Sequence, residues 1–156
     1  MEEAFKEYVI NRKINIPFLL NSFLQYNVNS YEGKVYCPFH ENYHTPAAKL
    51  YNNKDGDTLF CFSERKVYHP VDFFKKNIIK YNVEKLFNNI WNKLSLDERR
   101  ALEEEFGTYN TDTISPIWYN NKENLNRFKE YKANIGSHIQ FLINIIDVIK
   151  GEETDV

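Results

Sequence analysis

The sequence contains little cysteine, methionine, proline or glycine, and no long apolar run. It has two cysteines, one methionine, five prolines and five glycines. So few cysteines exclude a disulfide-rich secreted scaffold, and the scarcity of proline and glycine excludes a low-complexity linker. No basic and apolar signal segment opens the chain, and no apolar run is long enough to cross a bilayer. We expect a cytoplasmic protein with no membrane contact, in which two cysteines are more typical of a metal site than of a disulfide.

The sequence also lacks an excess of positive charge. It carries 20 Lys and Arg against 22 Asp and Glu, a formal net charge of −2. Proteins that coat nucleic acid are usually basic, because much of their affinity comes from the release of counterions. Any contact with nucleic acid therefore requires a local basic patch. What the sequence does contain is 42% hydrophobic residues, enough for a folded core, and abundant Asn, Lys, Ile, Tyr and Phe, whose A/T-rich codons suggest a bacterial or bacteriophage genome.

The order of hydrophobic patterns predicts an α+β fold. Asn15 is a good helix cap and Pro17 suits a first helical turn, so we expect a helix to begin there. The Asn-, Asp- and Gly-rich stretch 52–57 is typical of a hairpin turn between two short strands. The expected elements up to residue 80 are helices over 1–14, 15–26 and 70–80, and strands over 34–36, 49–51 and 58–62.

Beyond residue 80 the pattern is helical. Apolar residues over 83–94 recur at the spacing of one helix face, and Ser95 with Glu98 predicts a capping box for a helix that stops at Gly107. After a polar connection over 109–115, a heptad-like stripe comprises Leu125, Phe128, Ile135, Ile139, Leu142, Ile146 and Ile149. We expect this stripe to pack on the 83–94 stripe within the chain, or else on another copy or a partner. The predicted parts are residues 14–80 and a helical extension over 81–150.

Three residues carry metal-binding chemistry. Cys37 and His40 are close enough in the chain to share one tight turn and to present a sulfur and an imidazole to one ion. Zinc accepts such a mixed set of ligands in a tetrahedron. Cys61 follows at the end of the predicted hairpin, and the intervening residues are numerous enough to form the strands that bring it back.

These residues also carry a resemblance to a known family. Cys37-Pro38-Phe39-His40, Thr45-Pro46, Phe60-Cys61-Phe62 and Val71-Asp72-Phe73-Phe74 occur in the order found in the zinc-binding domain of bacterial and phage replicative DNA primases. The chain resembles this domain over residues 14–80. The resemblance implies a small antiparallel zinc-ribbon sheet preceded by a helix, a bound Zn²⁺ ion, and contact with a single-stranded DNA template.

The position of the fourth ligand departs from the family pattern. The family has a cysteine where this chain has Glu64, and the glycines that follow are replaced by Arg65 to Tyr68. Glu64 can complete the tetrahedron, because a carboxylate oxygen is an acceptable zinc ligand. His69 or His44 can instead take that position. A third possibility is a fold that has lost the metal, with both cysteines buried as small apolar residues.

Basic and aromatic residues surround the same stretch. Between residues 61 and 80, two acidic side chains stand against five basic ones, which are Arg65, Lys66, Lys75, Lys76 and Lys80. We predict that Arg65 and Lys66 contact phosphate, with Lys75 and Lys76 extending the surface, and that Tyr68 stacks on an unpaired base. The alternative is that the rings fill the core and the lysines form a solvated helix face.

No enzyme chemistry is predicted for the chain alone. It has no phosphate-binding Gly-rich loop, and its acidic run Glu103-Glu104-Glu105 is typical of a solvated helix face. We predict a primase-like accessory protein of phage DNA replication, with a structural Zn²⁺ because four chain ligands leave no position for a substrate. Its expected partners are single-stranded DNA or a replication protein such as a helicase or a primase catalytic chain. Two alternatives are a phage interaction factor that binds a host enzyme without touching nucleic acid, and one subunit of a split primase.

Overall fold

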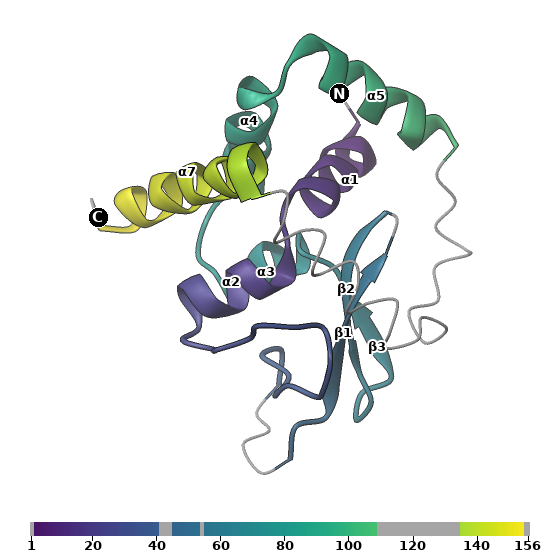
Figure 1. The fold of residues 1–156 in the computed structure, drawn as a ribbon, viewed down its shortest axis with the longest axis vertical. Helices are drawn as coiled ribbons and strands as arrows, with labels where there is room; N and C mark the ends of the chain where they lie inside the picture. The colour runs from purple at the N-terminus through teal and green to yellow at the C-terminus, as the bar shows by residue number, and fades with distance from the viewer. Residues whose placement is uncertain (1, 41–44, 54, 109–134, 155–156) are drawn as a thin grey trace.

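A computed structural model describes residues 2–40, 45–53, 55–108 and 135–154 (Figure 1). The described elements are α1 (Glu3–Lys13), α2 (Ile16–Phe23), β1 (Ala48–Asn53), β2 (Gly56–Cys61), β3 (Lys66–Tyr68), α3 (Asp72–Lys75), α4 (Val83–Lys93), α5 (Leu96–Gly107) and α7 (Ile135–Thr154). The predicted α+β class is confirmed. Among these residues, no helix combines the length and the apolar character that a membrane span requires.

The strands form one antiparallel sheet in the order β1-β2-β3. Leu50, Leu59 and Tyr68 lie side by side across it and are buried on one face, as strand alternation requires. The predicted hairpin is confirmed, although both strands run further into the turn than expected. Gly56 has a φ of +118°, and a Cβ there would collide with the carbonyl oxygen of Asn11, so glycine lets the hairpin approach α1. The sequence analysis did not predict β3.

Helix α1 lies between the sheet and the helices α4 and α5 (Figure 1). It contacts β2 on one side and α4 and α5 on the other. Val9 and Ile10 are completely buried in this position. The ring of Phe5 contacts Trp91 of α4 and Phe106 of α5, with centroid distances of 5.6 and 5.4 Å. One buried cluster therefore includes residues of both predicted parts, 14–80 and 81–150, and the division between them stays a prediction.

The helical end follows the predicted apolar stripe closely. Helix α4 buries Leu86, Phe87 and Ile90, and α7, which contacts α4, buries Leu142 and Ile149. Four residues of the predicted heptad-like stripe lie outside the described side chains: Leu125, Phe128, Ile135 and Ile139. The predicted connection over 109–115 lies outside the described residues as well.

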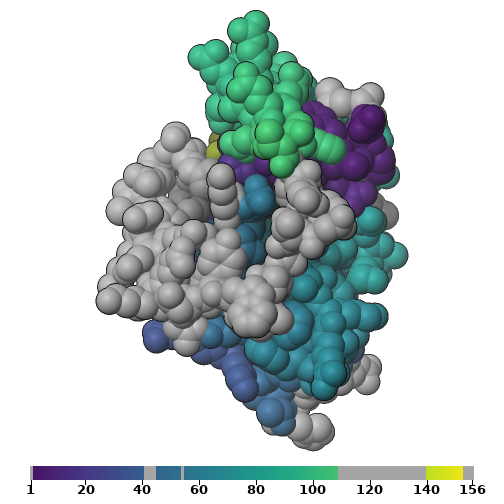
Figure 2. All heavy atoms as spheres, turned by 90° about the vertical axis from the view of Figure 1, so that its right-hand side faces the viewer, coloured from purple at the N-terminus to yellow at the C-terminus, as the bar shows by residue number. Residues whose placement is uncertain are grey.

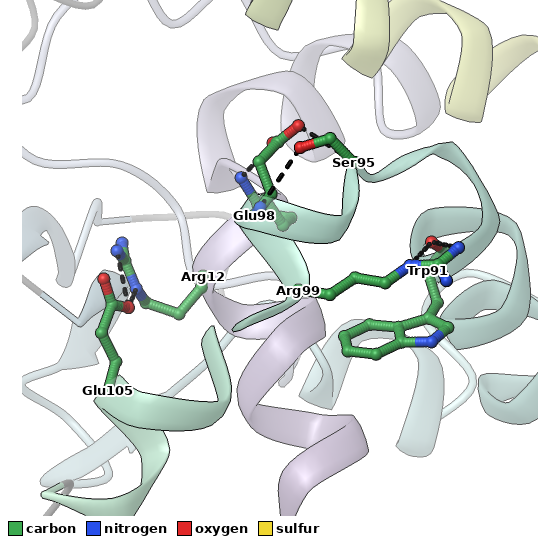
Figure 3. A network of polar contacts seen from close by, with 7 residues as sticks. Arg12, Trp91, Ser95, Glu98, Arg99 and Glu105 are labelled. Carbon is green, nitrogen blue, oxygen red and sulfur yellow. Dashed lines mark hydrogen bonds and ion pairs between the residues drawn. The ribbon is translucent and has the colours of Figure 1, made fainter. Parts of the chain in front are cut away.

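Polar contacts hold α5 in place (Figure 3). The predicted capping box is present, since Ser95 and Glu98 each accept a hydrogen bond from the other's backbone N–H. The Arg99 guanidinium donates to the carbonyl oxygen of Trp91 at 2.8 Å. Arg12 of α1 pairs with Glu105 at 3.0 Å, so the last residue of the predicted solvated acidic run joins two helices. In the space-filling view, α5 covers one end of the face and sheet residues lie toward the other (Figure 2).

Local predictions need correction in three places. The helix expected over 15–26 ends at Phe23, before the left-handed φ of +62° at Gln25. The helix expected over 70–80 is limited to α3, because Asn77 takes a left-handed φ of +58° and the chain turns back to bury Ile79. The strand expected over 34–36 is reduced to a single bridge between Val35 and Ala48. The differences over 70–80 and 34–36 arise from tertiary packing rather than from local propensity.

A buried carboxylate joins the hairpin to α2. Asp57 is 2% exposed and accepts hydrogen bonds from the backbone N–H of Ile16 at 2.9 Å, the Tyr31 hydroxyl at 2.8 Å and the Asn52 amide at 2.6 Å. Burial raises the pKa of Asp57 to about 6, although these hydrogen bonds act in the opposite direction. The contact fixes the start of α2 against the sheet that carries Cys61.

Candidate metal centre

Four potential metal ligands meet beside the sheet. The ligand atoms of Cys37, His40, Cys61 and Glu64 all lie within 4.8 Å of one another. The His40 Nδ1 is 2.9 Å from a Glu64 oxygen and 3.9 Å from the Cys61 sulfur, and the Cys37 sulfur is 3.9 Å from the same Glu64 oxygen. Such a group could hold one metal ion.

Three chain segments supply these ligands. Cys37 and His40 follow the Val35 bridge, and Cys61 ends β2. Glu64 lies in the turn between β2 and β3, where the N–H of Arg65 donates to the carbonyl oxygen of Cys61 at 2.7 Å. This turn folds Glu64 back toward Cys61. Arg65 has a left-handed φ of +56°, which favours glycine, the residue that the primase pattern has in this stretch.

The centre is half enclosed. Cys37 and Cys61 are buried, whereas the side chains of His40 and Glu64 are each 26% exposed. Burial raises the pKa of the Cys37 thiol to about 12 in the protein without metal. Because a metal ligand must be a thiolate, binding of an ion here releases protons.

A second layer of aromatic residues supports Glu64. The Tyr68 hydroxyl donates to the Glu64 carboxylate at 3.0 Å. Burial favours the neutral acid, but this hydrogen bond and the nearby His40 outweigh it and lower the pKa of Glu64. The Tyr68 ring stacks on Phe39 with centroids 3.9 Å apart, and Phe39 contacts Phe73. This support was not predicted from the sequence. Two signals pointed to it: Phe39 lies between the candidate ligands Cys37 and His40, and Tyr68 is two residues from exposed Lys66 in the chain.

His69 does not belong to the ligand group. Its backbone N–H donates to the carboxylate of Asp72, the first residue of α3, at 2.7 Å. Burial lowers the pKa of its imidazole, and the charged groups acting on it are Asp72 and Glu7 rather than the four ligands. His44, the other predicted substitute for the fourth ligand, lies outside the described residues.

The predicted nucleic-acid residues divide into two sets. Arg65, Lys66 and Lys76 are exposed, and Lys75 is exposed but pairs with Glu7 at 3.1 Å. Tyr68 is only 4% exposed, so the prediction that its ring stacks on a base is wrong: the ring fills the layer behind Glu64 instead.

Two other rings are exposed near the centre. Phe62 is 41% exposed, and the Lys34 Nζ lies 5.6 Å from the centre of its ring. Tyr36 is 43% exposed. Both were among the rings near the motif that could stack on bases, but strand alternation alone did not show which rings face outward. Each directly neighbours a candidate cysteine ligand in the chain. Exposed rings beside basic groups are the features expected of a stacking surface.

No protein-family model, curated protein or solved structure matches the chain. The likeness to primase zinc domains therefore rests on the residues quoted above.

Proposed function

We propose that Cys37, His40, Cys61 and Glu64 bind a structural Zn²⁺ ion. The observation that carries this proposal is the convergence of four ligand atoms within 4.8 Å from segments separated along the chain. Zn–S bonds of about 2.3 Å and Zn–N bonds of about 2.0 Å place a sulfur and a nitrogen of one tetrahedron roughly 3.5 Å apart. The distance between the Cys61 sulfur and His40 Nδ1 is 3.9 Å, so only a small contraction is needed.

Zinc at this position stabilises the sheet rather than catalysing a reaction. Four protein ligands fill a tetrahedron and leave no open position for a substrate. The ion would tie the segment before β1 to the end of β2, where the Phe62 N–H also donates to the carbonyl oxygen of Ala47 at 2.7 Å and the Lys34 ammonium lies over the Phe62 ring.

The proposed biological function is that of a primase-like accessory protein in DNA replication that binds single-stranded DNA. The ordered primase-like motif supports it, and so does the exposed chemistry next to Glu64. Arg65 is exposed on the turn that carries this ligand, and Lys66 is exposed at the start of β3. Phe62 with Lys34 offers a ring beside a positive charge. Phosphate would contact the basic side chains while bases stack on the ring.

A salt titration of binding to a labelled single-stranded oligonucleotide tests this function. The double variant Arg65→Ala with Lys66→Ala should weaken binding and reduce the slope of log K against log salt by about one to two. The matched control is Lys93→Ala with Arg100→Ala, which removes the same charge from exposed positions on α4 and α5. Equal losses in both variants, or no binding at low salt, would contradict the proposed DNA contact.

A second candidate is a phage interaction factor that uses the same scaffold to bind a host enzyme. The net charge of −2 and the pairing of Lys75 with Glu7 favour it, because both reduce the positive field available to DNA. The exposed apolar residues Leu96 and Ile143 offer protein contacts, with 61% and 40% of their surface exposed. This function predicts no oligonucleotide binding. A split primase would instead show primer synthesis when a separate catalytic chain is added.

A further inference from the structure

A pocket of about 640 Å³ adjoins the ligand group. One wall is the segment Leu24–Asn27, which follows α2, and the other is formed by Tyr36, Cys37, Pro38 and His40. Ile78 completes the lining. The volume is within the range of small-molecule sites, about 300–1,000 Å³.

Hydrogen bonds hold the two walls together. The Tyr26 hydroxyl donates to the carbonyl oxygen of Tyr36 at 2.8 Å, which joins one wall to the other. The side-chain amide of Asn21 exchanges two hydrogen bonds of 2.8 Å with the backbone of Val28 and so fixes the segment after α2. A site whose walls are already fixed loses little entropy when a ligand binds.

The lining indicates the class of ligand. Among the described residues, the lining contains no Lys, Arg, Asp or Glu, and its cysteine and histidine, Cys37 and His40, are the proposed metal ligands, so with zinc bound it offers no free charge to a phosphate or an ammonium. It offers the amides of Gln25 and Asn27, which both donate and accept hydrogen bonds, and the rings of Tyr26 and Tyr36. A neutral, planar ligand with mixed donors and acceptors suits this combination. Nucleobases have these properties, and aromatic side chains stack on any of the bases.

We propose that this pocket binds one unpaired nucleobase, with Tyr36 as the stacking ring and Gln25 and Asn27 at the base edge. The proposal rests on the proposed single-strand binding and specifies which surface receives a base. The charge distribution supports the arrangement, since the pocket and the turn that carries Arg65 both adjoin one ligand group. Cys37 lines the pocket, and its sulfur is 3.9 Å from Glu64, the residue before Arg65. A strand could place a base in the pocket and its phosphates near the turn.

The proposal is tested with two probes on the zinc-supplied full chain. Free nucleosides, which carry no phosphate, report the pocket alone through NMR chemical-shift titration. Tyr36→Ala should weaken nucleoside binding roughly 5- to 150-fold, the range for loss of one base–aromatic stack. Leu96→Ala is the control, because Leu96 is an exposed apolar side chain of α5 outside the lining, and it should leave nucleoside binding unchanged.

The second probe is an oligonucleotide of about eight nucleotides, compared with its abasic counterpart. Tyr36→Ala should weaken binding of the normal strand and not of the abasic one. Strand binding without any Tyr36-dependent nucleoside binding would overturn the pocket and leave the DNA function standing. Tyr36-dependent nucleoside binding without strand binding would support the pocket and contradict the DNA function. Absence of both would overturn both.

Discussion

The helical end and the metal-binding end of the molecule are held together by different means. At the helical end, α4 and α7 bury many apolar side chains, and Leu86 and Ile90 are completely buried. Stabilisation there is distributed over a large apolar area. At the other end, four polar side chains meet at one point, and two of them are 26% exposed. Loss of one side chain from a distributed core lowers the free energy of unfolding only in part. Loss of one ligand from a four-ligand centre should abolish metal binding altogether.

Helix α1 connects the two ends. The carbonyl oxygen of its Asn11 is approached closely by Gly56 of the hairpin, and the Asn11 side chain accepts a hydrogen bond from Val71 N–H at 2.9 Å. At its other end Phe5 packs on Trp91. The two regions therefore share a core. Substitutions in one region can show whether the stability or metal binding of the other depends on it.

The largest effect is expected from loss of a ligand. Cys61→Ser should reduce the zinc content from about one ion per chain to near zero and should unfold the sheet, because structural zinc contributes roughly 10 kcal/mol or more in small zinc domains. The same loss is expected for His40→Gln. Elemental analysis with thermal unfolding measures both. His69→Gln is the control, since this histidine lies outside the ligand group and should leave the zinc content unchanged; zinc loss there would reassign the fourth ligand.

A core truncation should separate the two ends. Ile90→Ala removes a completely buried side chain of α4 and should cost about 2–5 kcal/mol of unfolding free energy, through lost burial and a new cavity. The folded protein should still bind one zinc. Denaturant unfolding and metal analysis check the two statements. Leu96→Ala, at an exposed position, should change stability by no more than about 0.5 kcal/mol. If Ile90→Ala released the metal from folded protein, the two ends would not be independent.

The free energy of unfolding should depend on pH through Asp57, the buried carboxylate that joins the hairpin to α2. Its pKa is raised from 3.8 to about 6 on folding, so between these values the folded state holds a proton that the unfolded state has lost. The contribution of Asp57 is therefore complete below about pH 4 and falls as pH rises to about 6, by up to about 3 kcal/mol.

The measurement for Asp57 is a difference between two proteins. Unfolding free energy is followed against pH for the natural chain and for Asp57→Asn, which cannot ionise. Ligand protonation affects both proteins alike, so the difference between the curves isolates this carboxylate. Parallel curves over pH 4–6 would show that the buried group does not titrate there.

The smallest effect is expected in the turn that carries Glu64. Arg65→Gly should raise the unfolding free energy by up to about 1 kcal/mol, because glycine tolerates the left-handed φ of +56° without a Cβ clash. Asn77→Gly, at a φ of +58°, should gain less, since asparagine already tolerates this region. Thermal unfolding of the zinc-bound variants makes the comparison. A destabilised Arg65→Gly would mean that the Arg65 side chain holds the turn.

Much of the helical end was predictable, because its signals are local. The spacing of Leu86 and Ile90 marks one helix face, and Ser95 with Glu98 forms the predicted capping box. The candidate metal ligands Cys37, His40 and Cys61 could also be singled out from the sequence, since few other residue types provide such ligands, and the structure brings them together. Strand β3 was missed because three residues carry too little pattern, and the helix over 70–80 was predicted too long because Ile79 is drawn back into the core.

Local sequence patterns were enough for the described helix faces, the Ser95–Glu98 capping box, the hairpin and the set of residues able to hold a metal, because each depends on residue types or on neighbours a few positions away. It was tertiary packing that brought Glu64 rather than His69 beside Cys37, His40 and Cys61. Packing also placed Tyr68 behind this group rather than on the surface, and it formed the pocket between the end of α2 and the Tyr36–His40 segment. These features depend on contacts between segments far apart in the chain, and side-chain type alone does not show which of them meet.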